Sequence, residues 1–380
     1  MYKRYQNFKD LDNNSMFLWG ARQTGKSTLL KMLYPDSLYF DLLMSDVFMR
    51  FLRNPEQFRE VILATNPSLP VIIDEIQKLP VLLDEIHWLI ENKGYQFIMS
   101  GSSPRKILHS GVNLLGGRAL KYLLFPLSYI EIPDFDLNRA LNNGLSPRHY
   151  DSENAEKLIA SYIGNYLEDE IIAETRIRNI SVFSNFLEKA AFSNGEILNY
   201  TNIATDCGIS SPTVKEYFLI LKETLIGDFV EAYRKKPKRR VVSSPKFYFF
   251  DVGIANHLLK RKKIEFGSIN FGFAFKHFIY HELRTYSHYS GKNFSIYYWR
   301  TASGLKVDFI LGDNEIAIEV KSTINVQQRH LKGLYAFGEE YNVKEKIVVS
   351  HDTFIRKTSN DILIYPWKEF LDKLWAGKII

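Results

Sequence analysis

The chain has 380 residues, of which 46% are hydrophobic and 24% charged, and its formal net charge is +6. Such a composition excludes a largely disordered chain, and the length favours two or three domains. A single cysteine excludes an internal disulfide and a thiolate zinc site. No apolar run approaches the roughly 18 residues that a membrane helix needs. We therefore expect a cytoplasmic protein without a membrane segment, and the modest positive charge favours polyanionic partners.

The first motif is a glycine-containing loop at residues 20–27, GARQTGKS, which matches the pattern G-x-x-x-x-G-K-[ST]. An apolar run of strand length precedes it and a helical segment follows it. A loop in this position points backbone N–H groups and a helix N-terminus at one place, so it binds phosphates. Lys26 is expected to reach the β and γ phosphates and Ser27 to bind Mg²⁺. The expected nucleotide-binding residues are Gly20, Ala21, Arg22, Gln23, Thr24, Gly25, Lys26, Ser27 and Thr28.

Two carboxylates follow a short β-branched run at residues 69–73. Such a run is typical of a buried parallel strand, whose carboxyl end faces the nucleotide in a phosphate-loop enzyme. Asp74 is expected to hold magnesium through water, and Glu75 to act as the general base that polarises the attacking water. The structural alternative is that this acidic pair caps the next helix.

The next apolar run, residues 95–99, ends in a cluster of small polar residues. One of its serines, Ser100, Ser102 or Ser103, is expected to orient the hydrolytic water or to sense the γ-phosphate. A helix N-cap is equally compatible with these hydroxyls.

Phosphate loop, acidic pair and serine sensor together resemble the AAA-family ATPases, and residues 126–131 resemble the end of that domain in a subfamily of predicted prokaryotic ATPases. The resemblance covers nearly the whole chain. It implies ATP and Mg²⁺ as cofactors and an α/β domain over residues 1–135, with one strand between the phosphate-loop strand and the acidic strand. Arg118 lies where that family carries an arginine finger, which would act on a neighbouring subunit's ATP in a homo-oligomer. A surface arginine paired with an acid is the alternative.

A helical and winged-helix domain is expected over residues 150–252, after an Asn-, Asp- and Gly-rich connection at 134–147. Residues 198–217 have the order of a helix-turn-helix, and the strand-like runs 226–233 and 247–250 would form its hairpin wing. Six basic residues at the expected wing tip suit DNA phosphates, although a solvated loop or a protein-packing module is the alternative. They are Arg234, Lys235, Lys236, Lys238, Arg239 and Arg240.

The C-terminal part, residues 265–380, resembles the restriction-endonuclease-like fold. Asp308 and the pair Glu319 and Lys321 lie on two expected strands of one hairpin, and Glu282 lies on an upstream helix. Two carboxylates can hold a divalent cation that activates water against a phosphodiester, while the lysine stabilises the developing charge. A surviving ion-pair core that catalyses nothing is the alternative.

Taken together, the sequence predicts an ATP-hydrolysing protein whose turnover controls a DNA-directed, nuclease-like C-terminal module. Two other functions stay open. One is a nucleotide-dependent switch that binds a protein partner without cutting DNA, and the other is an ATP-regulated, metal-dependent DNA nuclease.

Overall fold

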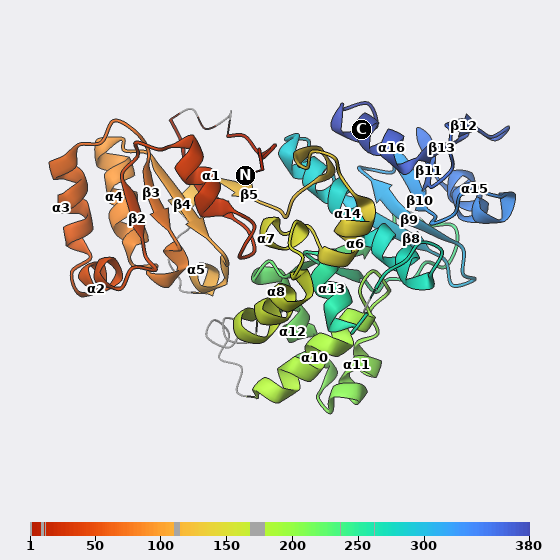
Figure 1. Cartoon of the computed structure of the whole chain (residues 1–380), viewed down its shortest axis with the longest axis horizontal. Coiled ribbons are helices and arrows are strands. Elements are labelled where there is room, and N and C mark those ends of the chain that lie inside the picture. Colours follow the sequence, from red (N-terminus) through yellow and green to blue (C-terminus); the bar gives the residue numbers. More distant parts are fainter. Residues whose placement is uncertain are drawn as a thin grey trace.

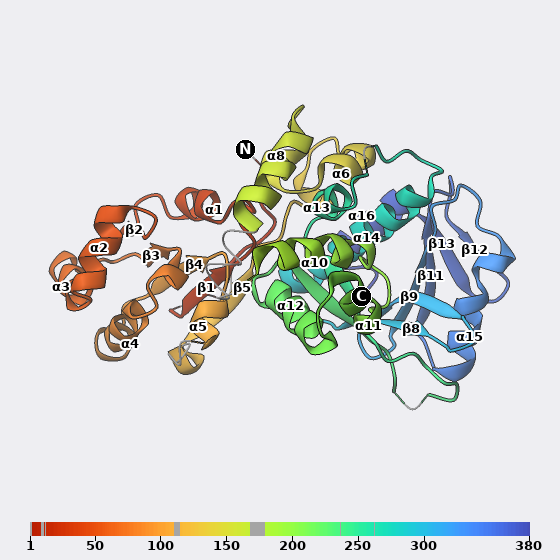
Figure 2. The same cartoon turned by 90° about the horizontal axis from the view of Figure 1, so that it is seen from below.

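The computed structural model describes residues 2–8, 11, 13–109, 115–167, 179–235, 237–261 and 263–380. The described elements form two β-sheets that lie at opposite ends of the molecule, with a helical region between and below them (Figure 1). The turned view shows the same order along the long axis (Figure 2). None of the described helices is long and apolar enough to cross a bilayer.

The N-terminal sheet has five parallel strands in the order β2-β3-β4-β1-β5. Its strands are β1 (Ser15–Trp19), β2 (Tyr39–Asp41), β3 (Val71–Asp74), β4 (Phe97–Gly101) and β5 (Ala119–Leu123). The helices of this part are α1 (Lys26–Leu33), α2 (Ser45–Arg53), α3 (Glu56–Thr65), α4 (Leu82–Lys93) and α5 (Arg105–His109). Strand β4 lies between β1 and β3, so the expected single strand separates the phosphate-loop strand from the acidic strand. The α/β phosphate-loop architecture predicted from the sequence is therefore confirmed.

The central region is helical. It comprises α6 (Leu137–Asn143), α7 (Pro147–Tyr150), α8 (Ala155–Ser161), a π-helical turn (Tyr162–Leu167), α10 (Ile180–Phe192), α11 (Tyr200–Cys207), α12 (Ser211–Glu223) and α13 (Val252–Leu258). The expected connection at 134–147 is not an irregular linker, because α6 buries Leu137, Ala140 and Leu141 in the main core. The Asn and Gly residues lie at the C-terminal end of this helix instead. Its C-cap is Gly144, whose φ of 79° favours glycine.

Helices α11 and α12 form the expected helix-turn-helix order. Gly208 has a φ of 66° at the turn, and the Ser210 hydroxyl accepts a hydrogen bond from the N–H of Thr213 to cap α12. The hairpin that follows pairs β6 (Gly227–Ala232) with β7 (Lys246–Phe249) in antiparallel register. It is not a free wing, because β6 also pairs in parallel with β8 (Ile296–Arg300) of the C-terminal sheet.

The C-terminal sheet is mixed and has eight strands in the order β12-β13-β11-β10-β9-β8-β6-β7. Its further strands are β9 (Lys306–Leu311), β10 (Ile316–Val320), β11 (Glu345–Ser350), β12 (Arg356–Lys357) and β13 (Ile362–Pro366), and its helices are α14 (Ile269–Tyr289), α15 (Lys332–Glu340) and α16 (Trp367–Trp375). One hydrophobic core runs from Met16 and Leu18 of β1 through α14 to α16. The N-terminal sheet and the C-terminal sheet therefore share apolar packing.

Candidate active site

The carboxyl ends of β1, β3 and β4 meet at one edge of the N-terminal sheet, since Trp19 is in register with Gly101 and Asp74 with Ser100. The buried Asp74 carboxylate collects three hydroxyl donors there. It accepts hydrogen bonds from Ser27 at 2.6 Å, from Tyr39 at 2.5 Å and from Ser100. A hydroxyl and a carboxylate converging from the loop and the neighbouring strand form a donor set that fits Mg²⁺. The pKa of Tyr39 is raised because the phenol is partly buried and bonded to Asp74.

The phosphate loop is closed around its lysine. The Lys26 ammonium donates to the carbonyl oxygens of Gly20 at 2.7 Å and Ala21 at 3.2 Å, and the residue is only 5% exposed. Gly25 has a φ of 94°, and a Cβ on Gly20 would lie 2.4 Å from the Leu124 carbonyl oxygen. Both glycines are therefore required by the shape of the loop. Phosphate oxygens suit the positive charge of Lys26 better than neutral carbonyls do.

The second carboxylate of the site, Glu75, is held by a residue that sequence reasoning missed. Gln77 donates through its amide both to the Glu75 carboxylate and to the Ser102 hydroxyl, the latter at 3.0 Å, and Ser102 lies 3.3 Å from Glu75. The backbone of Glu75 has a φ of 61°, which is an uncommon conformation for this residue type. Strain of this kind clusters at functional sites. The only feature of the sequence that could have indicated this role for Gln77 is its position two residues after Glu75.

The three candidate serines have separate contacts. Ser100 donates to Asp74, Ser102 contacts Glu75 and Gln77, and Ser103 accepts a bond from the N–H of Arg105 at 3.2 Å at the start of α5. The contact of Ser103 is therefore that of a helix N-cap, whereas Ser100 and Ser102 lie beside the two carboxylates, as a sensor would. Ser102 is the one placed beside the expected general base.

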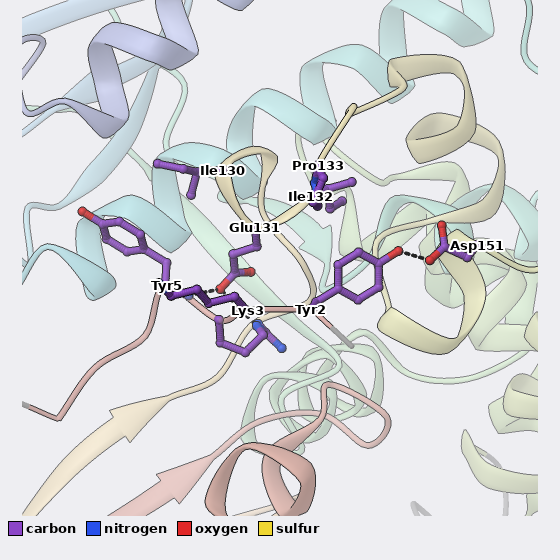
Figure 3. A pocket seen from close by; sticks show the side chains of 9 residues that line it. Tyr2, Lys3, Tyr5, Ile130, Glu131, Ile132, Pro133 and Asp151 are labelled. Atoms are coloured by element: carbon purple, nitrogen blue, oxygen red, sulfur yellow. Dashed lines mark hydrogen bonds and ion pairs between the residues drawn. The ribbon is translucent and has the colours of Figure 1, made fainter. Parts of the chain in front are cut away.

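A buried arginine near the N-terminus also reaches the loop, and no motif in the sequence predicts this contact. Arg4 donates to the Thr24 carbonyl at 2.5 Å, to the Phe125 carbonyl at 2.6 Å and to the Glu131 carboxylate at 3.0 Å. It also donates to the Tyr289 hydroxyl of α14 at 3.2 Å. Figure 3 shows Glu131 at the adjoining pocket, a cavity of about 690 Å³, where the Tyr5 N–H also donates to it. Arg4 thus ties the phosphate loop to the C-terminal part of the chain.

Arg118 lies at the opposite edge of the same sheet. Ser15, the first residue of β1, is in register with Ala119, the first residue of β5, so Arg118 precedes the strand end that lies farthest from the phosphate loop. Five residues of strand separate the two edges by about 16 Å. Arg118 is paired with Glu91, and both side chains are about 40% exposed. This geometry is incompatible with a contact between Arg118 and a nucleotide in its own chain.

The basic segment after β6 is partly neutralised by the C-terminal part. Arg239 pairs with Glu339 at 2.7 Å and with the fully buried Glu340 carboxylate at 3.1 Å, and Lys235 pairs with Asp313. Two of the six residues expected to contact DNA phosphates are therefore already paired with carboxylates of the chain. The exposed side chains of Arg234, Lys238 and Arg240 make no ion pair in the described part of the chain, and Lys236 lies outside it.

The structure brings three of the four nuclease-like residues together. Glu319 Oε2 accepts the backbone N–H of Asp308 at 3.2 Å, and the Lys321 ammonium lies 2.5 Å from Glu319 Oε1. Burial acts to raise the pKa of Asp308, but the surrounding lysines, first Lys276 and then Lys246, hold it well below its usual range.

Glu282 lies elsewhere, which corrects the expected set of three carboxylates. It is fully buried and accepts hydrogen bonds from the Tyr129 N–H at 2.9 Å and from the Trp375 indole at 2.8 Å. Burial raises its pKa to about 8. Across the described ranges, no group of three or more His, Cys, Asp or Glu side chains is arranged to hold a metal ion.

Comparison with known proteins identifies the N-terminal part. A model described as AAA domain matches residues 12–133, and two models described as domains of unknown function, DUF8612 and DUF4143, match residues 134–265 and 271–370. An uncharacterized protein of Methanocaldococcus jannaschii is 22% identical over 391 residues, covering 93% of this chain and 86% of that protein. An uncharacterized protein of Haemophilus influenzae is 21% identical over 287 residues, covering 67% of this chain and 71% of its own. The chain is thus similar to the AAA domain over its N-terminal third and to two domains of unknown function over the residues that follow.

Proposed function

We propose that the AAA domain binds and hydrolyses MgATP and that the rest of the chain responds to the bound nucleotide. The observation that carries the proposal is the 2.6 Å contact between the Ser27 hydroxyl and the Asp74 carboxylate. These are the two groups that hold Mg²⁺ in phosphate-loop enzymes, and here the fold has already brought them together.

The other residues of the site have roles that follow from their positions. Lys26 and the loop N–H groups bind and orient the phosphates, so that the γ-phosphate is held for in-line attack. Glu75, buried and hydrogen-bonded to Gln77, accepts a proton from the attacking water, and Ser102 helps to position it. Mg²⁺, when bound with ATP, neutralises charge that develops on the phosphate oxygens.

Two substitutions test these roles separately. Lys26→Ala should abolish tight binding of a fluorescent ATP analogue and with it hydrolysis, because the ammonium that pairs with the phosphates is lost. Glu75→Gln should bind the analogue like the unaltered protein but hydrolyse ATP at least 10²-fold more slowly. Lys93→Ala, at the exposed C-terminal end of α4, is the matched control and should change neither. Full hydrolysis by Lys26→Ala would refute the assignment of the loop.

Contacts across the domains support control of the C-terminal part by the nucleotide. Ala21 of the phosphate loop is buried in the core of the helical region, which also contains Phe250. Arg4 joins the loop carbonyl of Thr24 to Tyr289 of α14. Movement of the loop on phosphate binding would therefore displace contacts with both C-terminal domains.

The target of that control is proposed to be DNA, bound through the helix pair α11–α12 and the cations that stay unpaired. A double variant, Arg234→Ala with Arg240→Ala, should weaken binding to duplex DNA and lower its dependence on salt. Lys235→Ala, which removes a cation already paired with Asp313, is the matched control and should have a smaller effect. Binding that does not change with salt, or no binding at all, would contradict a DNA target.

A second candidate is a nucleotide-dependent switch that binds a protein partner. The observation that favours it is a set of exposed apolar side chains on two adjacent loops, Ile324 at 65%, Phe354 at 66% and Ile355 at 42%. The backbone bond from His351 to Thr323 holds these loops together. If DNA binding is absent, Phe354→Ser should abolish ATP-dependent capture of a partner while leaving hydrolysis unchanged.

A further inference from the structure

Each carboxylate oxygen of the nuclease-like motif has a contact with a group of the chain itself. Asp308 Oδ1 lies 2.7 Å from the Lys276 ammonium, and Oδ2 accepts the N–H of Val320 at 3.0 Å. Glu319 Oε1 lies 2.5 Å from the Lys321 ammonium, and Oε2 accepts the N–H of Asp308. Each of the four oxygens thus already has one partner within the chain, so a divalent cation could bind only beside these donors or by displacing them.

The cation that stands against Asp308 comes from helix α14. Lys276 lies on the part of the helix that faces β9 and β10, and its side chain is 14% exposed. Glu282, six residues later, is rotated by about 120° around the helix axis and faces Tyr129 and Trp375 instead. The helix therefore presents an ammonium to the motif where a third carboxylate was expected.

The charge balance of the cluster also disfavours a divalent cation. Two buried carboxylates are already balanced by Lys276 and Lys321. A third ammonium, that of Lys246 on β7, is 94% buried nearby, lies over the ring of Tyr298 at 5.0 Å and makes no ion pair in the described ranges. The two paired ammonium groups already neutralise the carboxylates, and in a buried site their repulsion of an entering divalent cation is weakly screened. The residues present do not fit a catalytic metal.

We propose that Lys276 takes the place of the metal ion in this Asp-Glu-x-Lys motif, so that the C-terminal domain is metal-free and does not cleave nucleic acid by a metal-dependent route. The cluster is a structural ion network. It joins α14 to the β9–β10 hairpin through the pair between Lys276 and Asp308.

A consequence is that the motif can be opened by a single substitution. Lys276→Gln removes the positive charge and leaves the two carboxylates with one ammonium, that of Lys321. The buried pair then carries a net negative charge, which a divalent cation would neutralise. Lys276→Arg keeps the charge and should leave the motif closed.

Mn²⁺ binding to the full-length, nucleotide-free protein tests the proposal, with the free ion followed by electron paramagnetic resonance. All proteins carry Asp74→Asn, which removes the carboxylate at the end of β3 that is proposed to hold Mg²⁺ with ATP. The Asp74→Asn protein should bind no Mn²⁺ through Asp308, so adding Asp308→Asn should not change its titration. Adding Lys276→Gln should create one Mn²⁺ site that Asp308→Asn abolishes, and Lys276→Arg should create none.

Two results would overturn the proposal. One is a Mn²⁺ ion bound by the Asp74→Asn protein and lost on adding Asp308→Asn, because the motif would then already hold a metal. The other is a folded Lys276→Gln protein, judged by circular dichroism, that gains no Mn²⁺ site. The first comparison keeps Lys276 in place, so it decides the question even if the Lys276→Gln protein fails to fold.

Discussion

Removal of the Glu131 carboxylate should be among the most destabilising single changes outside the candidate active site. Glu131 and Arg4 form an ion pair at 3.0 Å, and their side chains are only 1% and 5% exposed. Glu131 also accepts the backbone N–H groups of Tyr5 at 2.6 Å and Ser128 at 3.0 Å. Glu131→Ala therefore leaves two donors and a buried guanidinium without this partner. Breaking a buried pair in this way costs about 3–5 kcal/mol.

The matched control is Glu91→Ala, which removes the exposed partner of Arg118. A surface pair of that kind is worth at most about 1 kcal/mol. The free energy of unfolding, measured by urea denaturation of both variants, should therefore fall several-fold more for Glu131→Ala. Adding Arg4→Met to Glu131→Ala should recover part of the loss, because no buried charge is then left unpaired. Equal losses for Glu131→Ala and Glu91→Ala would refute the reasoning.

Two further predictions concern acid stability and the arginine finger. His277 is buried and neutral, with Nε2 donating to the Phe249 carbonyl at 2.7 Å and Nδ1 accepting from Asn194 at 3.2 Å, and burial lowers its pKa to about 4. The unfolded chain then binds more protons than the folded one between pH 6.5 and 4. The free energy of unfolding should therefore decrease by about 1.4 kcal/mol for each unit by which the pH is lowered in that window. In His277→Gln, the urea concentration at the midpoint of unfolding should depend less on pH. If Arg118 acts on a neighbouring subunit, Arg118→Ala and Lys26→Ala proteins, each inactive alone, should recover ATP hydrolysis when mixed, and failure to recover it would remove Arg118 from catalysis.

The local part of the nucleotide site could be predicted from the sequence. A phosphate loop is a contiguous segment, so its glycines, lysine and serine are recognised within a few residues of one another. The strand that carries Asp74 is predicted by its apolar run. Gln77 and Arg4 could not be found in this way. Arg4 meets Glu131 across 127 positions of the chain, and no pattern near residue 4 distinguishes it from any other terminal arginine.

The C-terminal motif shows where pattern matching stops. The alternation of side chains along strands correctly places Asp308 beside Glu319, because both lie on paired strands of one hairpin. Which face of α14 meets that hairpin depends on packing against Trp375 and Tyr129. The sequence pattern indicated Glu282 on this helix, and the fold places Lys276 beside Asp308 instead. In the same way, the pairing of Arg239 in the basic segment depends on Glu340, which lies more than 100 residues away in the sequence.

Release of inorganic phosphate from ATP in the presence of Mg²⁺ is the most direct measurement of the central claim. The unaltered protein should turn ATP over repeatedly, and Glu75→Gln should bind ATP yet release phosphate at a rate at least 10²-fold lower. Turnover that is the same in both proteins would contradict the assignment of Glu75. No ATP binding by the unaltered protein would contradict the function proposed for the whole site.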